Sequence, residues 1–383
     1  MRTVYLDNNA TTEVYEEVLD AMLPYFRKKF GNPSTKYGYG KEARRAVEEA
    51  RDKVAELIDC APHEIAFTSG GSESNNEALV GAVRAAGDGS RVLMSRIEHS
   101  SMTECMKRLT CERHEWRVIG VDGKGRMNLE DIRKGVYGTG GIMRCVVSAM
   151  WANNETGNIN PISEIEKIAH EFNALVVTDA VQAVGKVPID VKEVQVDVLT
   201  ASGHKFHAPK GIGFIYVRNG VELPSLILGG RQEHGLRAGT ENVPSIVGLG
   251  KACEIAKREL AEGTAEMARL RDRLQDGILR MCDTANVNGD AENRLANTLN
   301  VSFMKYSGEK MMYRLAERGV CVTTGSACSL GGIKPSHVLT EMKVGKAAAS
   351  GGIRFSLSRS TTEEDIDHAI WAVKDSLEEM KRG

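Results

Sequence analysis

The stretch VDVLTASGHK, residues 196–205, passes from a short apolar run directly into polar residues. Its Val, Leu and Thr residues favour β-structure, and a run of this length fits a buried strand better than a helix. Ser202, His204 and Lys205 come immediately after the run. The pattern therefore predicts a strand whose end carries chemically useful side chains.

Five further apolar runs between about residues 65 and 220 are similar to this one. They are brief, rich in Val, Ile and Leu, and separated by amphipathic stretches of helical length. The runs are EIAFTSG at 64–70, RVLMS at 91–95, RCVVSAMW at 144–151, ALVVTDA at 174–180 and GFIYVR at 213–218. Such alternation predicts an α/β fold in which a mostly parallel sheet is covered by helices on both faces.

Polar residues follow most of these runs. In a parallel sheet of this kind, ligands bind beyond the carboxyl ends of the strands. The residues that follow the runs are Gly71, Ser72 and Glu73, Glu98 and His99, Asn153 and Asn154, Asp179, and Ser202, His204 and Lys205. We therefore expect the ends of five strands to converge on one pocket.

The pattern changes beyond about residue 250. A long charged helical stretch leads into the short runs NTLNVSF, GVCVTT and GIRFSLS, and an amphipathic helix closes the chain. Thr361 and Glu364 predict a capping box at the start of that helix. We expect a large domain over residues 15–250 and a smaller α/β domain formed by residues 251–383 together with residues 1–14.

Length, charge and hydropathy narrow the class of protein. The chain has 383 residues, of which 42% are hydrophobic and 27% charged, and a net charge of −2. That balance is typical of a soluble globular protein and argues against nucleic acid or an anionic membrane as the main partner. The N-terminal MRTVYLDNNATT has no apolar signal segment and no run has membrane-spanning length, so we expect a cytoplasmic protein.

The stretch TSGGSESNNEA, residues 68–78, predicts a strand end, a loop of small residues and the start of a helix. N–H groups at a helix N-terminus attract anions, Gly70 and Gly71 permit close approach, and Ser72 adds a hydroxyl. The stretch is therefore a candidate phosphate site. Glycines also occur in such turns for steric reasons alone, so this motif by itself leaves both interpretations open.

Asp179 and Lys205 suggest a more specific chemistry. Asp179 follows an apolar strand, where a partly buried carboxylate needs a cationic partner or serves as a helix N-cap. A protonated pyridine nitrogen is such a partner in enzymes that use pyridoxal 5′-phosphate (PLP). Lys205 lies between an apolar run and a turn, where partial burial helps a lysine to lose its proton and form a Schiff base.

The run GIRFSLS, residues 352–358, alternates apolar and polar side chains. Ile353, Phe355 and Leu357 share one face, which places Arg354 on the polar face of a strand. A guanidinium there suits two-point binding of a carboxylate such as that of an amino acid. A surface salt bridge is the alternative interpretation.

Eight cysteines occur without a C-x-x-C pair or a cluster of His and Cys at zinc spacing. We therefore expect neither a disulfide framework nor a metal site, and we expect most of these thiols to be inert. Cys328 differs because the surrounding TTGSACSLGGIKPS, residues 323–336, is rich in glycine and serine and has few apolar residues to hold it.

Taken together, these motifs resemble those of the PLP-dependent fold type I enzymes of aminotransferase class V. More closely, the chain resembles cysteine desulfurases of the NifS/IscS type. The similarity extends from about residue 3 to residue 375 and rests on LDNNATT, FGNPS, MWANNETG, TDAVQAVGKVPID, SGHKFHAPKG, RAGTEN, GSAC and RFSLSR. It implies a large domain with a mostly parallel seven-stranded sheet, and a smaller C-terminal α/β domain that carries the catalytic cysteine.

The resemblance also implies roles for individual residues. Lys205 holds PLP through a Schiff base, Asp179 pairs with the pyridine nitrogen, and His99 stacks on the ring and assists proton transfer. The other cofactor-binding residues are Asn154 and Gln182 near the phenolic oxygen, Gly71, Ser72, Ser202 and His204 at the phosphate, and Thr240 from a second subunit. Arg354 and Asn154 bind the substrate. The role of Thr240 makes a homodimer the expected state.

The activity implied by the resemblance is removal of sulfur from L-cysteine. Cys328 attacks the substrate sulfur, which leaves L-alanine and a persulfide on Cys328. The persulfide sulfur is then passed to an acceptor. This acceptor is either a protein such as an IscU/NifU-type scaffold in iron–sulfur cluster assembly, or an acceptor in the pathway of tRNA thiolation. Gly325, Gly331 and Gly332 predict a mobile or exposed loop that carries the sulfur from substrate to acceptor.

Several alternatives stay open. The family's SSGSAC is TTGSAC here, and the RxGHHC pattern of the class that includes selenocysteine-preferring enzymes is lacking. Because the sequence ends at Gly383, we expect no longer tail of the kind that some members use to dock a scaffold, which leaves the acceptor undecided. The other interpretations are a different class-V aminotransferase or lyase, and a non-catalytic scaffold that binds sulfur or metal through Cys321 and Cys328.

Overall fold

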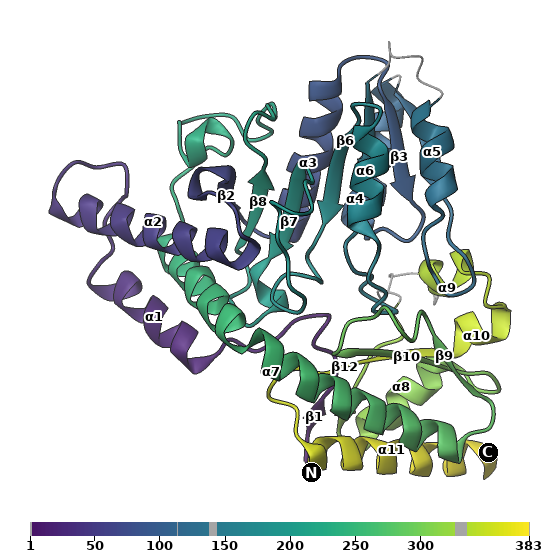
Figure 1. Cartoon of the computed structure of the whole chain (residues 1–383). Helices are drawn as coiled ribbons and strands as arrows, with labels where there is room; N and C mark the ends of the chain where they lie inside the picture. Colours follow the sequence, from purple (N-terminus) through teal and green to yellow (C-terminus); the bar gives the residue numbers. More distant parts are fainter. Residues whose placement is uncertain (1, 113, 138–143, 326–334, 383) are drawn as a thin grey trace.

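The computed structural model describes residues 2–112, 114–137, 144–325 and 335–382. Its largest sheet has seven strands in the order β2-β8-β7-β6-β5-β3-β4 (Figure 1). The pairs from β7 to β4 are parallel, whereas β8 runs antiparallel to both β2 and β7. The strands are β2 (Ile65–Thr68), β3 (Arg91–Ser95), β4 (Glu115–Ile119), β5 (Cys145–Ser148), β6 (Leu175–Asp179), β7 (Val198–Ser202) and β8 (Gly213–Val217).

All six apolar runs form strands of this sheet, which confirms the predicted α/β fold with a mostly parallel seven-stranded sheet. Adjacent residues of β6 point to opposite faces, and both faces are covered. Val176 packs into the larger core cluster, and Val177 packs into the cluster formed with α3 and α4. The seventh strand, β4, lies at the edge of the sheet and is partly exposed, so its sequence EWRVI lacks the continuous apolar signal.

Helices cover the sheet on both sides (Figure 1). α3 and α4 contact each other on one face, and α5 and α6 contact each other on the other face. These helices are α3 (Gly71–Ala86), α4 (Ser100–Leu109), α5 (Leu129–Tyr137) and α6 (Ile162–His170). Short 3-10 turns occur at η1 (Pro62–Glu64), η2 (Thr110–Glu112), η3 (Gly203–Lys205) and η4 (Glu233–Gly235).

One long helix, α7 (Val243–Met281), extends from the large sheet to a smaller unit of the fold (Figure 1). Its first half packs against α1 (Glu16–Arg27) and α2 (Gly38–Ile58). Gly250 sits so close to α2 that a Cβ atom there would lie 2.7 Å from the Cα of Ala50. The expected domain boundary near residue 250 falls inside this continuous helix, and the division into two domains stays a prediction.

The smaller unit has its own core and its own sheets. A three-stranded antiparallel sheet has the order β12-β10-β9, and β1 pairs with β11 in parallel. The N-terminal Val4 and Leu6 belong to this core together with side chains from α7 and α11. The elements are β1 (Val4–Tyr5), β9 (Ala285–Asn288), β10 (Thr298–Phe303), α8 (Gly308–Glu317), β11 (Val320–Cys321), α9 (His337–Glu341), α10 (Lys346–Gly351), β12 (Gly352–Ser356) and α11 (Glu363–Arg382).

The capping box of α11 lies one residue later than predicted. Thr362 Oγ1 accepts a hydrogen bond from the main-chain N–H of Asp365 at 3.2 Å, and the Asp365 carboxylate accepts one from Thr362 N–H at 3.0 Å. Thr361 instead accepts from Ser358 N–H in the preceding turn. The prediction for Thr361 and Glu364 was therefore wrong, because Asp serves in the box as well as Glu and the sequence alone does not separate the two registers.

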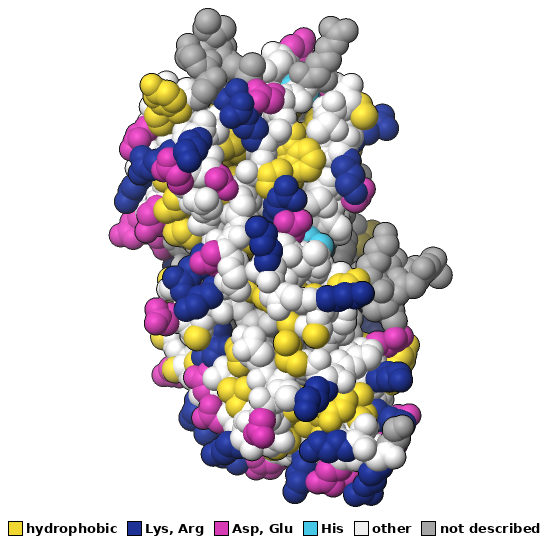
Figure 2. Space-filling model, turned by 90° about the vertical axis from the view of Figure 1, so that its right-hand side faces the viewer, with side chains coloured by type: hydrophobic (Ala, Val, Ile, Leu, Met, Phe, Trp, Pro, Cys, Tyr) yellow, Lys and Arg dark blue, Asp and Glu magenta, His cyan; other side chains and the backbone are white. Residues whose placement is uncertain are grey.

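The surface carries both signs of charge. On the face drawn in Figure 2, basic and acidic side chains are interspersed over both the large and the small unit, as a net charge of −2 indicates. Among the helices of the described ranges, none combines the length and the apolar character needed to cross a membrane.

Candidate active site

The predicted polar residues surround a cavity of about 390 Å³ at the carboxyl ends of the central strands. The ends of β2, β3, β5, β6 and β7 meet there, and the N-terminal segment and β12 close it from the small unit. Its lining includes Asn9, Gly71, Ser72, Asn75, His99, Asn154, Asp179, Gln182, Ser202, His204, Lys205, Thr323, Gly325 and Arg354. Residues from eight separate segments are thus brought together at one edge of the sheet.

Lys205 reaches this cavity from η3, directly after β7. Its Nζ donates hydrogen bonds to the main-chain carbonyl oxygens of Asn9 at 2.9 Å and Ala10 at 2.7 Å. Burial, and then the nearby Arg354 guanidinium, lower the pKa of Lys205 from 10.5 to about 8. A lysine with this pKa is partly neutral near pH 7 and can act as a nucleophile and a base.

Asp179 ends β6 with a buried carboxylate. Its Oδ1 accepts from Val181 N–H at 2.9 Å, and its Oδ2 accepts from the Asn75 side-chain amide at 2.8 Å. No Lys, Arg or His among the described residues forms an ion pair with it within 4.0 Å. Asp179 therefore presents a fixed negative charge to the cavity that a cationic group could neutralise.

His99 follows β3 and caps the N-terminus of α4. Its Nδ1 accepts from Ser101 N–H at 3.2 Å and lies 2.8 Å from Ser101 Oγ. Because Nδ1 acts as an acceptor, the proton of the neutral ring is on Nε2. Burial lowers the pKa of His99, so the ring that lines the cavity is neutral at pH 7.

Glu98 lies beneath this part of the site and is fully buried. One carboxyl oxygen accepts from Met150 N–H at 2.6 Å, and the other has no hydrogen-bond partner in the described chain. Burial, and then repulsion by Asp179, raise the pKa of Glu98 to about 8. Glu98 is therefore mostly protonated at neutral pH, which leaves Asp179 as the negative charge at the cavity.

The opposite end of the cavity has the features of an anion site. Gly71 begins α3, whose first-turn N–H groups have no partners within the helix, and Ser72 is the next residue. A Cβ atom on Gly71 would lie 3.0 Å from Val181 and 3.3 Å from Ser202, so glycine allows the helix end to approach these residues. His204 lies 3.0 Å from the Thr11 hydroxyl, and burial lowers its pKa to about 4.

Arg354 enters the cavity from β12. One of its terminal nitrogens donates to Asp7 at 2.6 Å and the other to the Asn154 main-chain carbonyl at 2.9 Å. Its Nε is buried and has no hydrogen-bond partner among the described residues. The guanidinium is therefore oriented by Asp7 and Asn154 while part of its donor capacity is unused.

The sequence analysis did not assign a role to Asn9 or Asn75. Asn9 accepts hydrogen bonds at its main-chain carbonyl from Lys205 and from the Gln182 side chain, at 2.9 and 3.0 Å. Asn75 joins Asp179 to the Ser101 hydroxyl. Asn9 belongs to the motif LDNNATT, which carries the family resemblance, and Asn75 belongs to TSGGSESNNEA, which marks the start of a helix. The sequence therefore marks both motifs as important but does not show what these two side chains contact.

Cys328 lies outside the described residues, as do Gly331 and Gly332. The predictions for this loop stay predictions. On either side of it, the chain is held by the buried Glu155. Its carboxylate accepts from Ser336 Oγ, and a Cβ atom on Gly325, whose φ is +81°, would lie 2.6 Å from Glu155 Oε2.

The remaining cysteines have no disulfide bond between them, and most are buried. Burial raises the pKa of Cys145 to about 12 and of Cys105 to about 11, so these thiols stay protonated. Cys111 is exposed in η2, directly after α4, and does not line the cavity. Within the described ranges, no group of three or more potential metal ligands occurs.

Thr240 is exposed in the loop before α7 and is not part of the cavity lining. Of the predicted cofactor-binding residues in the described chain, it is the one that this single chain does not bring to the cavity. Its predicted role depends on a second subunit and is taken up below.

Comparison with known proteins places this site in a family. Residues 4–368 match the aminotransferase class-V family, and the chain belongs to that family. Within it, the chain is similar to cysteine desulfurases. It is 43% identical to cysteine desulfurase NifS of Azotobacter vinelandii over the whole chain and 94% of that protein.

Solved structures agree with this placement. A NifS-like protein superimposes with a TM-score of 0.91 and 38% identity, covering 98% of this chain and all of the other. SspA in complex with cysteine superimposes with a TM-score of 0.82 and 32% identity, covering 94% of this chain and all of the other. The chain is thus a NifS/IscS-type member of the class-V family.

The residues present at the cavity fit PLP. The volume of about 390 Å³ is in the range of small-molecule sites. Asp179 has no cationic partner among the described residues, Lys205 has a lowered pKa, and the N-terminus of α3 offers N–H groups to an anion. These three features match the pyridine nitrogen, the aldehyde and the phosphate of the cofactor, respectively.

The pKa of Lys205 predicts a pH-dependent stability of the cofactor-free protein. Its folded-state pKa of about 8 is below the ordinary 10.5, so between these values the unfolded chain binds more protons and stability rises with pH. Lys205→Met removes that dependence. We expect it to be more stable than the wild type by at most ~3 kcal/mol below pH 8, an advantage that shrinks as the pH rises to 10.5.

Urea unfolding midpoints measured from pH 7 to 10.5 test this prediction. Lys210→Met is the matched control, because Lys210 is exposed and lies five residues further along the same segment. A stability difference between Lys205→Met and the wild type that does not change with pH would contradict a depressed pKa at Lys205.

Proposed function

We propose that this chain is a PLP-dependent cysteine desulfurase that uses the residues assembled at the cavity. The observation that carries the proposal is the pairing of a buried lysine of pKa about 8 with an unpaired buried aspartate in one cavity. The identity of 43% to a NifS cysteine desulfurase over the full chain supports the same activity. The solved complex of SspA with cysteine supports L-cysteine as the substrate.

The cofactor is held by residues from five strand ends. We assign Lys205 to its aldehyde carbon, Asp179 to its pyridine nitrogen and His99 to its ring. Asn154 and Gln182 are placed near its phenolic oxygen, and Gly71, Ser72, Ser202 and His204 bind its phosphate. PLP supplies an electron sink that makes the α-proton of a bound amino acid acidic and the bond to its β-substituent labile.

Arg354 orients the substrate. Its guanidinium is fixed by Asp7 and the Asn154 carbonyl, and each terminal nitrogen has a second N–H that these two hydrogen bonds do not use and that can bind a carboxylate. A fork that is held in place loses little entropy when it binds the α-carboxylate of L-cysteine. Binding there directs the α-carbon and the sulfur of the substrate toward the middle of the cavity.

Lys205 moves the α-proton of the substrate. With a pKa of about 8, its amine is a base in part of the population at neutral pH and can return the proton afterwards. His99 is neutral with its proton on Nε2, and its Nδ1 is occupied by Ser101 N–H, so the ring offers a donor to the cavity. Lys205 is therefore the base of the pair and His99 the donor.

Cys328 accepts the sulfur. Its thiolate attacks the sulfur of L-cysteine, the bond between that sulfur and the substrate β-carbon breaks, and a sulfur–sulfur bond forms on Cys328. The β-carbon receives a proton, so the products are L-alanine and a persulfide, and all atoms of L-cysteine are accounted for. No external oxidant is needed because the carbon is reduced as the sulfur is oxidised.

The partners follow from this chemistry. A persulfide must be delivered to an acceptor, and we propose a protein acceptor such as an IscU/NifU-type scaffold in iron–sulfur cluster assembly, with tRNA thiolation as the alternative. We also propose a homodimer in which Thr240 contributes to the phosphate site of the other subunit. The exposure of Thr240 in the single chain supports this arrangement.

Cys328→Ser separates cofactor binding from sulfur transfer. We expect the variant to stay yellow from bound PLP and to lose persulfide and sulfide formation by at least ~1000-fold, because serine is a poor nucleophile toward sulfur at neutral pH. The wild type and the control Cys111→Ser should release sulfide and alanine in equal amounts from L-cysteine with a reductant.

Three outcomes would contradict the proposal. Full sulfide release by Cys328→Ser would show that another group accepts the sulfur. A colourless wild type would favour a non-catalytic scaffold. Pyruvate in place of alanine, with the cofactor converted to its amine form, would favour an aminotransferase.

Gly325→Ala tests whether the contact with Glu155 matters for sulfur transfer. A Cβ atom there would lie 2.6 Å from the buried Glu155 carboxylate, so this end of the Cys328 segment must move. We expect the rate of persulfide formation to fall about tenfold, the effect of ~1.4 kcal/mol on the barrier. PLP content should not change.

Gly345→Ala is the control. Gly345 also has a positive φ, of +91°, but has open space around it, so this substitution imposes a similar backbone cost without touching Glu155. Equal rates for the two variants would mean that the Glu155 contact has no role in sulfur transfer.

A further inference from the structure

Lys186 is a buried lysine for which the proposed chemistry has no use. It follows β6 in the segment TDAVQAVGKVPID and is 7% exposed. Its Nζ donates to the Gln182 side-chain oxygen at 2.6 Å and to the Asn9 side-chain oxygen at 3.2 Å. Its amine forms no ion pair with a described Asp or Glu within 4.0 Å, although burial of an unpaired ammonium is costly.

Lys186 connects to Lys205 through a single residue, Asn9. The Asn9 side-chain oxygen accepts from Lys186, and the Asn9 main-chain oxygen accepts from Lys205 at 2.9 Å. The side-chain amide of Asn9 donates to the Thr298 hydroxyl at 2.8 Å and to the Asn154 carbonyl at 3.2 Å. Asn9 is thereby fixed on all sides, and its two oxygens hold the two lysines.

Lys186 also determines which end of the Gln182 amide faces which neighbour. The Lys186 amine donates to Gln182 Oε1, so the Gln182 Nε2 lies on the other side of the amide. Nε2 donates one of its two N–H groups to the Asn9 main-chain oxygen at 3.0 Å. Gln182 lines the cavity beside Lys205, so its remaining N–H is available to an oxygen there. If the residue at position 186 could only accept hydrogen bonds, the Gln182 amide would instead turn its Nε2 toward that residue.

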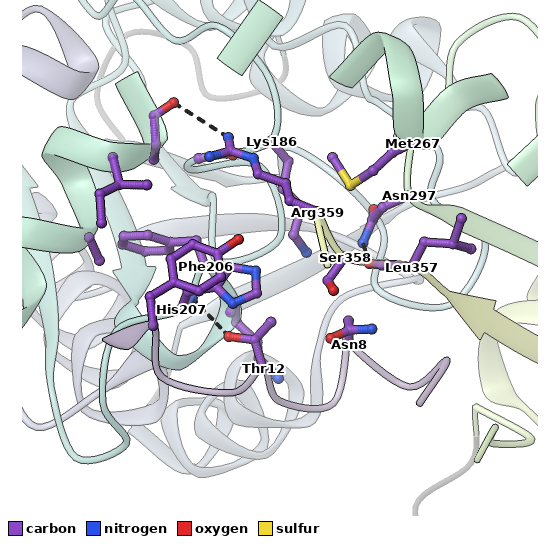
Figure 3. A pocket seen from close by; sticks show the side chains of 16 residues that line it. Asn8, Thr12, Lys186, Phe206, His207, Met267, Asn297, Leu357, Ser358 and Arg359 are labelled. Atoms are coloured by element: carbon purple, nitrogen blue, oxygen red, sulfur yellow. Dashed lines mark hydrogen bonds between the residues drawn. The ribbon is translucent and has the colours of Figure 1, made fainter. Parts of the chain in front are cut away.

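The space behind Lys186 offers no replacement for its contacts. Lys186 lines a separate cavity of about 20 Å³ with Asn297, Ser358 and Arg359, and Lys205 lines both this cavity and the larger one (Figure 3). About 20 Å³ is room for one water molecule. Removal of the amine would leave the buried Gln182 Oε1 without its donor, whereas Asn9 Oδ1 would keep the hydrogen bond that it accepts from the Asn297 side-chain amide at 3.0 Å.

We propose that Lys186 is a positioning residue for the cofactor site, which holds Gln182 and Asn9 so that they orient Lys205 and present an amide donor to the cofactor. The proposal rests on PLP binding at the larger cavity. It assigns to the lysine of TDAVQAVGKVPID a role in orienting other residues rather than in forming a bond to the cofactor.

Lys186→Met tests the proposal because methionine has a similar length and no N–H donor. We expect the dissociation constant for PLP, measured by titrating the cofactor-free protein, to rise about tenfold, because the buried Gln182 Oε1 loses its donor and Asn9 Oδ1 loses one of its two. We also expect the visible absorbance of the bound cofactor to titrate at a pH about half a unit higher or more, since a lysine and a fixed amide donor near Lys205 are lost.

Two further variants complete the experiment. Lys192→Met removes an exposed lysine six residues further along the chain and should match the wild type in both readouts. Lys186→Gln keeps N–H donors without the charge and should lie between the wild type and Lys186→Met, which keeps the test usable if the methionine variant does not fold.

The outcomes separate this proposal from the proposed function. A wild type that binds no PLP would overturn the function itself. A wild type that binds PLP, with Lys186 variants that melt at lower temperature but keep its PLP affinity and its absorbance titration, would show that Lys186 is only a structural residue and would overturn the proposal.

Discussion

The active site depends on how the amine of Lys205 is held. Two main-chain carbonyls, from Asn9 and Ala10, accept its hydrogen bonds, and no carboxylate neutralises it by direct contact within the described chain. Burial next to the Arg354 guanidinium then favours the uncharged amine and lowers the pKa to about 8. The N-terminal segment that supplies these carbonyls enters the core of the small unit at Val4 and Leu6, so the geometry of the lysine requires both units of the fold.

The titratable groups around Lys205 are also controlled by burial and by hydrogen bonds from neighbouring segments. Asp179 is held by the Val181 N–H and the Asn75 amide, whereas Glu98 nearby accepts a single hydrogen bond within the described chain, and burial raises its pKa to about 8. His99 is neutral because burial lowers its pKa, and the hydrogen bond that its Nδ1 accepts at the start of α4 places the remaining proton on Nε2. A site with one aspartate charge, a neutral imidazole and a lysine of lowered pKa is suited to a cofactor that brings a cationic ring nitrogen and an anionic phosphate.

The sequence predicted the central sheet because each of its buried strands is a short apolar run, and it predicted the cavity residues because polar side chains follow those runs directly. It did not predict β4, whose edge position leaves it partly exposed and without a continuous apolar pattern. It also did not indicate what Asn9, Lys186 or Glu155 do, because their contacts join segments more than a hundred residues apart. Local patterns locate strand ends, but they do not show which amide or carboxylate from a distant segment completes a site. The capping box of α11 was predicted one residue too early, because neighbouring Thr and acidic residues allow two registers.

The most direct test is to identify the lysine that carries the cofactor. The holoenzyme is reduced with borohydride, which fixes PLP permanently to the amine that holds it, and the protein is digested and its peptides are analysed by mass spectrometry. We expect one modified peptide, with the cofactor on Lys205, and loss of that peptide in Lys205→Ala. Cofactor on Lys186, or on no single lysine, would contradict the central claim that the amine held by Asn9 and Ala10 is the reactive one.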